Sequence, residues 1–261
     1  YKFEKMYFKK VNIKKLLKNK IVLDLGCFTG GRTAVWAKRY DIKTIYGIDI
    51  DSVYIEAARL FSQKMGNNTH FQISYGEELP FEDNFFDAII TSDTFEHVRD
   101  LKKVLQECQR VLKGDGIIIC SFPQYLSPFE HHLGFVTKTP CIHWFFKNTD
   151  IHEVYYEIIQ ERGDEAYWYK RSSPALKEWE KLSNINGTSI RGFRKMIKEM
   201  RWHIYFHSPI PILTTGRLFN KYVIFRLLSN CFKIFAKLPY LEELFCERIV
   251  YILKKPKQNI K

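Results

Sequence analysis

The sequence predicts an α/β fold in which helices cover both faces of a mostly parallel sheet. Short apolar runs without polar alternation, such as "IVL" at 21–23 and "IIIC" at 117–120, are typical of strands buried on both faces. Between residues 20 and 122 these runs alternate with segments of helical periodicity, as in sheets built from strand–helix units. The 261 residues suffice for one large domain with an insertion.

Seven strands are expected, five of them in the first half of the chain. The five are "KIVLDLG" (20–26), "KTIYGIDID" (43–51), "THFQIS" (69–74), "FFDAIITSD" (85–93) and "GIIICSFP" (116–123). Two later segments, "RWHIYFH" (201–207) and "ERIVYILKKP" (247–256), complete the predicted sheet.

The helices are predicted from apolar spacing and from capping residues. Ser52 is expected to cap one helix that stops near Gly66, and Gly114 is expected to end another. The predicted helical segments are 2–18, 31–40, 52–66, 101–112, 188–200 and 217–238.

Four segments follow from this pattern. We expect an N-terminal helix at 1–19, a ligand-binding core at 20–122, a substrate-binding insertion or lid at 123–200, and C-terminal strands with an amphipathic helix at 201–261. Residues 123–187 are rich in aromatic, His and Pro residues and lack strand alternation.

The formal net charge of +12 favours anionic partners such as nucleic acid, anionic lipid or phosphorylated substrates. Six scattered cysteines without CxxC spacing argue against a zinc site and a disulfide framework, and favour a reducing, cytoplasmic compartment. We expect no bound metal. No apolar run reaches the length of a membrane span, and no secretory signal is visible.

The stretch "DLGCFTG" places Asp24, Gly26 and Gly30 directly after a strand. In parallel sheets ligands bind beyond the carboxyl ends of the strands, and glycines allow the backbone to approach them closely. The spacing is not the G-x-G-x-x-G that seats a pyrophosphate, which disfavours a nicotinamide oxidoreductase. An acid here suits a ligand that carries an ammonium and a sulfonium. Asp49, nineteen residues past Gly30, can accept both hydroxyls of a ribose.

Several motifs resemble those of class I S-adenosylmethionine-dependent methyltransferases, especially the group of quinone-biosynthesis C-methyltransferases and small-molecule O-methyltransferases. The matching motifs are "VLDLGCFTGGRT", "YGIDID", "GEELPFEDNFFDAIITSDTFEHV" and "RVLKGDGIIICSFP". The resemblance covers 20–122 well, continues loosely near 188–200 and the last strand, and covers 123–187 poorly. It implies a Rossmann-like, doubly wound fold, with S-adenosyl-L-methionine as cofactor and S-adenosyl-L-homocysteine as product.

The resemblance also implies residue roles. It assigns the methionine moiety to Asp24 and to the turn that contains Gly26, Cys27 and Gly30, and the methionine ammonium to the backbone near Thr91 and Ser92, with Asp93 close by. It assigns the ribose to Asp49 and the adenine ring to Ile50. The edge of the adenine is assigned to Tyr75, Gly76 and Glu77. Two residues depart from the family pattern. Phe28 replaces a frequent glycine and needs a tolerant backbone angle, and Tyr75 replaces an aspartate that accepts from the adenine amino group, so either Glu77 substitutes or that bond is lost.

A hydroxyl acceptor usually needs a base, and histidine titrates in the right range. "FEHHLGF" offers Glu130, His131 and His132, and the resemblance adds Glu96 and His97 as candidates beside the substrate. All of these can equally be structural or surface residues. A metal site built from these histidines with His143 is a minor alternative. The aromatic runs "AYWYK" (166–170) and "CIHWFF" (141–146) can line an acceptor pocket or form a lid core.

The segment 217–238 has basic residues on one side and a broad apolar face opposite. This pattern fits a helix on an anionic membrane surface and also a helix that covers a sheet, and the second interpretation is favoured.

We therefore expect an enzyme that methylates a small molecule, most simply a hydroxyl of a sugar, a lipid-linked compound or a secondary metabolite. An RNA or nucleic-acid methyltransferase is the first alternative, although "TSDT" differs from the motif of amino-directed nucleobase methylation and no RNA-binding module is visible. A non-catalytic module that binds S-adenosylmethionine is the second. No nucleic-acid partner is expected, and the oligomeric state is left open.

Overall fold

The computed structural model describes residues 4, 7–65, 68–128, 137, 139–162, 186–212, 214, 223–238 and 241–256. The chain forms two compact units. The first comprises Tyr1–Ser121, Ile197–Ser208 and Tyr251–Lys261, and the second comprises Phe122–Met196 and Pro209–Val250. The boundaries predicted at 19, 122 and 200 stay a prediction.

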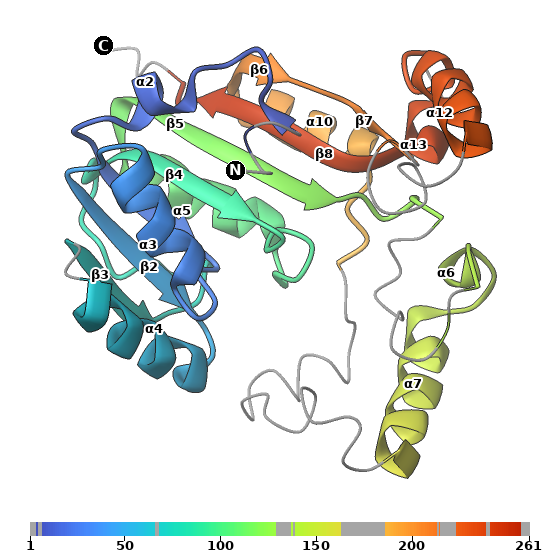
Figure 1. Ribbon diagram of the computed structural model, residues 1–261, viewed down its shortest axis with the longest axis horizontal. Helices are drawn as coiled ribbons and strands as arrows, with labels where there is room; N and C mark the ends of the chain where they lie inside the picture. Colours follow the sequence, from blue (N-terminus) through green and yellow to red (C-terminus); the bar gives the residue numbers. More distant parts are fainter. Residues whose placement is uncertain are drawn as a thin grey trace. The chain divides into compact units, whose positions relative to one another are not determined.

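One sheet has the strand order β3-β2-β1-β4-β5-β8-β6, with β7 paired to β8 (Figure 1). Pairing is parallel from β3 through β5 and antiparallel where β8 meets β6 and β7. The strands are β1 (Ile21–Leu25), β2 (Thr44–Asp49), β3 (Thr69–Ile73), β4 (Phe86–Ser92), β5 (Leu112–Pro123), β6 (His203–His207), β7 (Ile210–Pro211) and β8 (Cys246–Lys254). The predicted, mostly parallel sheet is confirmed, and the two-residue strand β7 is an addition that the sequence pattern did not indicate.

The helices described are α2 (Ile13–Leu17), α3 (Gly31–Arg39), α4 (Ser52–Met65), α5 (Leu101–Val111), α6 (Ile142–Phe145), α7 (Asn148–Arg162), α10 (Ile190–Glu199), α12 (Val223–Phe235) and α13 (Glu242–Phe245). In Figure 1, α3 and α4 lie in front of the strands of the first unit and α5 lies behind them, so both faces of the sheet are covered. Among the described residues, no helix combines the length and the hydropathy needed to cross a bilayer.

The central strands are buried on both faces, as their apolar runs predicted. Val22 and Leu23 of β1 point to opposite faces, and neither is exposed. The same holds for Ile118 and Ile119 of β5. Helix α5 covers one face with a fully buried stripe, Val104, Leu105, Cys108 and Val111, at the spacing of successive helical turns.

Three predicted helix ends are wrong, each for a local reason. The N-terminal helix does not run through residues 8–12, because Asn12 caps α2 by accepting a hydrogen bond from the Lys15 N–H at 3.0 Å. Helix α4 is capped by Asp51 rather than Ser52, since Asp51 Oδ1 accepts from the Val53 N–H at 2.8 Å. Helix α5 ends at Val111, and Gly114 lies inside β5.

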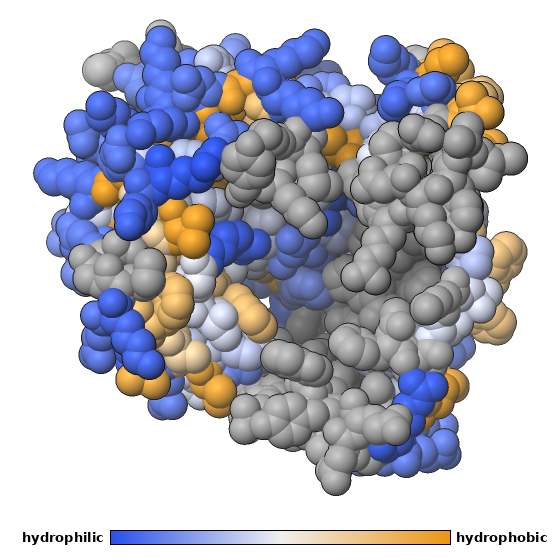
Figure 2. All heavy atoms as spheres, in the orientation of Figure 1, coloured by the Kyte–Doolittle hydropathy of each residue, from blue (hydrophilic) through white to orange (hydrophobic). Residues whose placement is uncertain are grey.

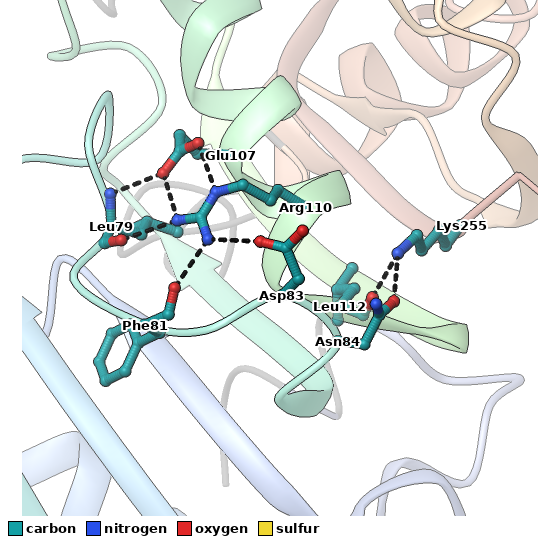
Figure 3. A network of polar contacts seen from close by, with 8 residues as sticks. All are labelled: Leu79, Phe81, Asp83, Asn84, Glu107, Arg110, Leu112 and Lys255. Carbon is teal, nitrogen blue, oxygen red and sulfur yellow. Dashed lines mark hydrogen bonds and ion pairs between the residues drawn. The ribbon is translucent and has the colours of Figure 1, made fainter.

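The loop that joins β3 to β4 is held against α5 by Arg110 (Figure 3). The guanidinium donates to the backbone oxygens of Leu79 and Phe81 at 2.8 and 2.7 Å, and to Glu107 at 2.7 and 2.8 Å. It also donates to Asp83 at 2.9 Å. The loop therefore has a fixed path from the end of β3 to the start of β4.

We expect Arg110→Met to lower the free energy of unfolding by about 2–4 kcal/mol, because partly buried carbonyl groups and Glu107 lose a charged donor. Urea denaturation monitored by circular dichroism measures this. As a control, Arg39→Met removes a largely exposed pair with Glu4 and a contact with the Tyr40 ring, and should shift the midpoint much less. Equal shifts for the two variants would contradict the role given to Arg110.

Candidate functional site at the carboxyl ends of β1, β2 and β4

The strand order reverses between β1 and β4, and in sheets of this kind ligands bind beyond the carboxyl ends of the strands at such a point. The turn after β1 lies there and has three left-handed residues, Gly26 (φ 78°), Phe28 (φ 52°) and Gly30 (φ 72°). A Cβ on Gly26 would lie 2.0 Å from Thr94 Oγ1, and one on Gly30 would lie 2.7 Å from the Ala58 Cβ. Both glycines are thus required by backbone angle and by space.

Phe28 occupies a strained position in this turn, because its backbone has the left-handed angle that glycine usually provides. A left-handed angle costs an L residue roughly 1–2 kcal/mol. Two contacts offset this cost: the Phe28 ring lies 4.1 Å from the Tyr54 ring, and the Phe28 N–H donates to Asp49 Oδ2 at 2.9 Å. The Phe28 ring is half-exposed, and the backbone of the turn lies within hydrogen-bonding distance of Asp49.

Asp49 ends β2 and is held by backbone donors from both sides. Besides the Phe28 N–H on Oδ2, Oδ1 accepts from the Asp51 N–H at 3.2 Å. Burial raises the pKa of the Asp49 carboxyl, while these N–H groups act in the opposite direction. A carboxylate has about four acceptor positions, so this one keeps capacity for further donors. Ile50, beside it, is half-buried.

Asp24 lies in β1 and is completely buried. Its Oδ2 accepts from the Thr33 hydroxyl at 2.5 Å, and Oδ1 has no partner among the described residues. Burial raises the pKa of this carboxyl, against the nearby Arg32 guanidinium and the Thr33 hydrogen bond. The carboxylate holds the first turn of α3 against β1. It can act on a ligand through its field but not by direct contact in this conformation.

Arg32 connects the ends of β1 and β4 and was not singled out from the sequence. Its Nη2 donates to the Ser92 oxygen at 3.2 Å and to the Gly26 oxygen at 3.4 Å, and its Nη1 lies 3.9 Å from Asp93 Oδ2. The position, two residues past the Gly30 turn and in the first turn of a helix, is the one signal that could have identified it.

At the end of β4 the backbone turns sharply at Asp93 (φ 58°). Ser92 is buried, and its hydroxyl donates to Asp93 Oδ2 at 3.0 Å. The Thr94 hydroxyl donates to the Leu25 oxygen at 3.2 Å. The turns after β1 and β4 are therefore joined by side chains, as a shared binding surface requires.

Glu96 and His97 follow this turn and form a pair. Glu96 is buried, whereas the His97 side chain is 39% exposed, and its Nε2 lies 3.8 Å from Glu96 Oε1. The buried carboxylate thus lies beside a ring that is partly exposed.

The turn after β3 contains the remaining predicted residues. Tyr75 is exposed, and Gly76 is buried where a Cβ would come within 3.3 Å of Val104. Glu77 Oε1 accepts from the Arg99 N–H at 2.9 Å and the Asp100 N–H at 3.3 Å. Glu77 therefore fixes this turn to the start of α5, using one of its two oxygens.

The catalytic candidates His131 and His132, with Glu130, lie outside the described residues, as does 166–170. His143 has a structural environment: it is buried, and its Nε2 lies 2.7 Å from the Tyr125 oxygen. Within the described ranges, no group of three or more His, Cys, Asp or Glu residues could hold a metal ion. Cys27, buried in the turn after β1, packs on Phe71, Ile55 and Ala58.

The arrangement fits a ligand with vicinal hydroxyls and cationic groups. One carboxylate, Asp49, is presented at a strand end beside a glycine-containing turn, and a second, Asp24, lies beneath the same turn with an oxygen that has no partner in the described part of the chain. Asp49 can accept from hydroxyl donors in strong, charge-assisted hydrogen bonds, whereas the buried Asp24 favours a cationic group through its negative field.

Comparisons with known proteins relate the chain to methyltransferases. Residues 23–120 match the family model described as "Methyltransferase domain". The chain is 32% identical over 183 residues to "Uncharacterized methyltransferase YcgJ" of Bacillus subtilis, covering 64% of this chain and 72% of that protein. The crystal structure of YcgJ superposes with a TM-score of 0.55 at 19% identity, covering 94% of this chain and 96% of that one.

Two other relatives carry specific names. "Malonyl-[acyl-carrier protein] O-methyltransferase 1" of Coxiella burnetii is 31% identical over 51% of this chain, and "Norajmaline N-methyltransferase" of Rauvolfia serpentina is 32% identical over 44%. The chain spans 43% and 41% of these two proteins. The names include both oxygen and nitrogen acceptors, and the quinone-related subgroup is not specifically supported.

Proposed function

Because the chain belongs to the class I S-adenosylmethionine-dependent methyltransferases, we propose that it transfers a methyl group to a hydroxyl of a small molecule. Candidate acceptors are a sugar, a lipid-linked compound or a secondary metabolite. The observation that carries the proposal is the pairing of two carboxylates at neighbouring strands with a glycine turn between them. S-adenosyl-L-methionine is the cofactor that this family uses.

Asp49 is the residue for the ribose. Its position at the end of β2 and its fixation by the Phe28 and Asp51 N–H groups leave it oriented before a ligand arrives. Because this carboxylate is already ordered, accepting two hydroxyls costs little conformational entropy of the side chain. Ile50 and the turn of Tyr75, Gly76 and Glu77 would then face the adenine.

The turn at Gly26, Cys27 and Gly30 is the place for the methionine moiety, with the Ser92 backbone and Asp93 on the opposite side. Arg32 keeps the two sides at a constant distance through its hydrogen bonds to Gly26 and Ser92. Asp24 contributes a negative field beneath the turn, which favours the cationic groups of the ligand.

When bound, S-adenosylmethionine supplies an electrophilic methyl group and its own leaving group. The chain then has to hold the acceptor in line and to take up the hydroxyl proton. His97 is the base supported by the described residues: with Nε2 toward Glu96, it can receive a proton on Nδ1, and the Glu96 carboxylate stabilises the resulting cation. His131 and His132 stay proposals for the same task from the insertion.

Turnover to S-adenosylhomocysteine, measured with panels of sugar, lipid-linked and phenolic hydroxyl acceptors, tests the proposal. His97→Ala should then lower kcat by about 100-fold or more with little change in cofactor affinity. Salt-dependent binding and methylation of RNA would support a nucleic-acid methyltransferase instead, which the charge of +12 alone suggests. Cofactor binding without turnover on any acceptor would indicate a non-catalytic module.

A location at an anionic membrane surface, through the segment 217–238, belongs to the same proposal because it would bring the site to a lipid-linked acceptor. The structure describes residues 223–238 of this segment, and the exposed surface of α12 can be assessed independently of the reaction.

A further inference from the structure

Helix α12 exposes an apolar face to solvent. At 100° per residue, Leu227, Cys231 and Ile234 project from the same side of the helix, with Leu228 and Phe235 beside them, and Leu238 follows in the turn after the helix. All of these side chains are exposed, Leu227 by 62% and Ile234 by 63%. A helix that only covered a sheet would have buried this face.

The opposite side of α12 accounts for its packing. Ser229 and Ala236 are buried, and Phe232 lies 5.4 Å from the ring of Phe245 in α13. The favoured prediction of a sheet-covering helix with a solvated basic side therefore describes one side of α12. On the second apolar face, the Phe235 ring lies 5.0 Å from the Phe245 ring, whereas Leu227, Leu228 and Ile234 are exposed to solvent.

Basic side chains line one flank of the exposed face. Lys233 and Lys237 are exposed, and Lys233 Nζ donates to Asn230 Oδ1 at 3.0 Å on the same flank. No acidic residue occurs from 200 to 241, and the whole chain carries +12. Figure 2 shows hydrophobic and hydrophilic side chains next to one another at the upper right, where α12 lies in Figure 1.

Another helix with exposed apolar residues differs in this respect. Helix α4 exposes Val53, Leu60 and Phe61, but Lys64 projects into the middle of that face and Glu56 lies at its edge. A charge of each sign there prevents a continuous apolar surface. Helix α12 thus has the separation of apolar and cationic faces that α4 lacks.

We propose that α12 is an interfacial helix that binds the surface of an anionic phospholipid bilayer. Its apolar face enters the boundary between headgroups and acyl chains, and Lys233 and Lys237 lie against the lipid phosphates. This is the geometry of amphipathic helices that lie in the membrane plane. With 13 residues, α12 is about 20 Å long, enough for a shallow anchor and too short for a span.

A second copy of the chain fits this face less well. In a two-fold contact each lysine flank would face the same flank of the partner or lie close to it, and like charges oppose such a contact. A single short helix also offers much less than the roughly 800 Å² per partner typical of stable interfaces. An anionic bilayer, in contrast, complements both the apolar face and the charge.

Cys231 allows a direct test, because it lies within the exposed face. Cys27, Cys108, Cys120 and Cys246 are buried, so a Cys141→Ser background leaves Cys231 as the one exposed thiol. A polarity-sensitive fluorophore on Cys231 of the full chain should shift to the blue with phosphatidylcholine vesicles that contain phosphatidylglycerol. Pure phosphatidylcholine should give little shift, and added salt should reverse the binding.

Co-sedimentation of unlabelled variants with the anionic vesicles separates the contribution of the apolar face from that of the two lysines. Ile234→Asn should weaken binding about tenfold or more, and the double variant Lys233→Gln/Lys237→Gln about 30-fold. Leu60→Asn, which replaces an apolar residue of matched 61% exposure on α4, should change nothing. Failure to bind at low salt, equal binding to neutral vesicles, or a dimer that Ile234→Asn dissociates would overturn the proposal, whatever the outcome of the turnover assays.

Discussion

Gly26→Ala is expected to destabilise the protein by about 3 kcal/mol and to abolish measurable binding of S-adenosylhomocysteine. A methyl group at this position would lie 2.0 Å from Thr94 Oγ1, and the φ of 78° is unfavourable for alanine. Relief of this overlap requires the turns after β1 and β4 to separate, which would also break the hydrogen bond from Thr94 to Leu25. Urea denaturation and isothermal calorimetry measure the two effects.

Two further variants identify the cause of this loss. Thr94→Ala should partly rescue Gly26→Ala, giving a coupling energy of about 1 kcal/mol in a double-mutant cycle, since it removes the two nearest atoms. Gly31→Ala is the matched control in the same sequence stretch. Its added methyl group meets nothing within 4 Å, and it lies in α3, so the stability should stay constant or rise. A loss for Gly31→Ala as large as that for Gly26→Ala would refute the explanation.

Asp49→Asn should weaken binding of S-adenosylmethionine by about 10–100-fold, because charge-assisted hydrogen bonds to the ribose become neutral ones. The same variant should change stability little at neutral pH, because one backbone N–H loses its acceptor while a carboxylate whose ionisation burial disfavours is removed. Burial raises the pKa of the native carboxyl, so the native state holds its proton more tightly than the unfolded state. Ionisation of Asp49 above its ordinary pKa therefore lowers the free energy of unfolding of the native protein. Asparagine does not ionise, so the variant lacks this loss.

Asp87→Asn provides the opposite control at the other end of the sheet. Although burial acts to raise it, the pKa of Asp87 is lowered by the Ile21 N–H and by Lys113, which lie 2.8 and 3.1 Å from its oxygens. Its stabilising contribution is present at neutral pH and is lost as the pH falls through the native pKa. Asp87→Asn should therefore reduce stability and leave cofactor affinity unchanged, the reverse of Asp49→Asn.

Much of the fold of the first unit could be predicted because local pattern and tertiary environment agree there. The runs at 21–23 and 117–120 lack polar residues since both faces of β1 and β5 are covered by helices. The glycines of the turn after β1 could be predicted for a similar reason. Gly26 and Gly30 have left-handed backbone angles and lie so close to neighbouring side chains that few other residues could replace them.

Features that depend on distant partners could not be predicted in this way. Arg32 bonds to Ser92, 60 residues later, and nothing near Arg32 in the sequence indicates that contact. Glu77 was assigned to the adenine edge, yet one of its oxygens accepts from the backbone of Arg99 and Asp100. The predicted starts of two helices are wrong, because Asn12 and Asp51 cap these helices at positions that the sequence pattern did not indicate.

The faces of α12 show a third limit. Sequence periodicity separates apolar from basic positions, but it does not tell which apolar positions are covered. Only the arrangement of α12 with α13 shows that Ser229 and Ala236 face inward while Leu227 and Ile234 face solvent.

A crystal structure of the chain grown with S-adenosylhomocysteine tests the central claim most directly. We predict the ribose hydroxyls within hydrogen-bonding distance of the Asp49 carboxylate, and the amino acid moiety between the Gly26–Gly30 turn and Ser92. A ligand bound elsewhere, or a site at the carboxyl ends of β1, β2 and β4 that stays empty at saturating ligand, would contradict it.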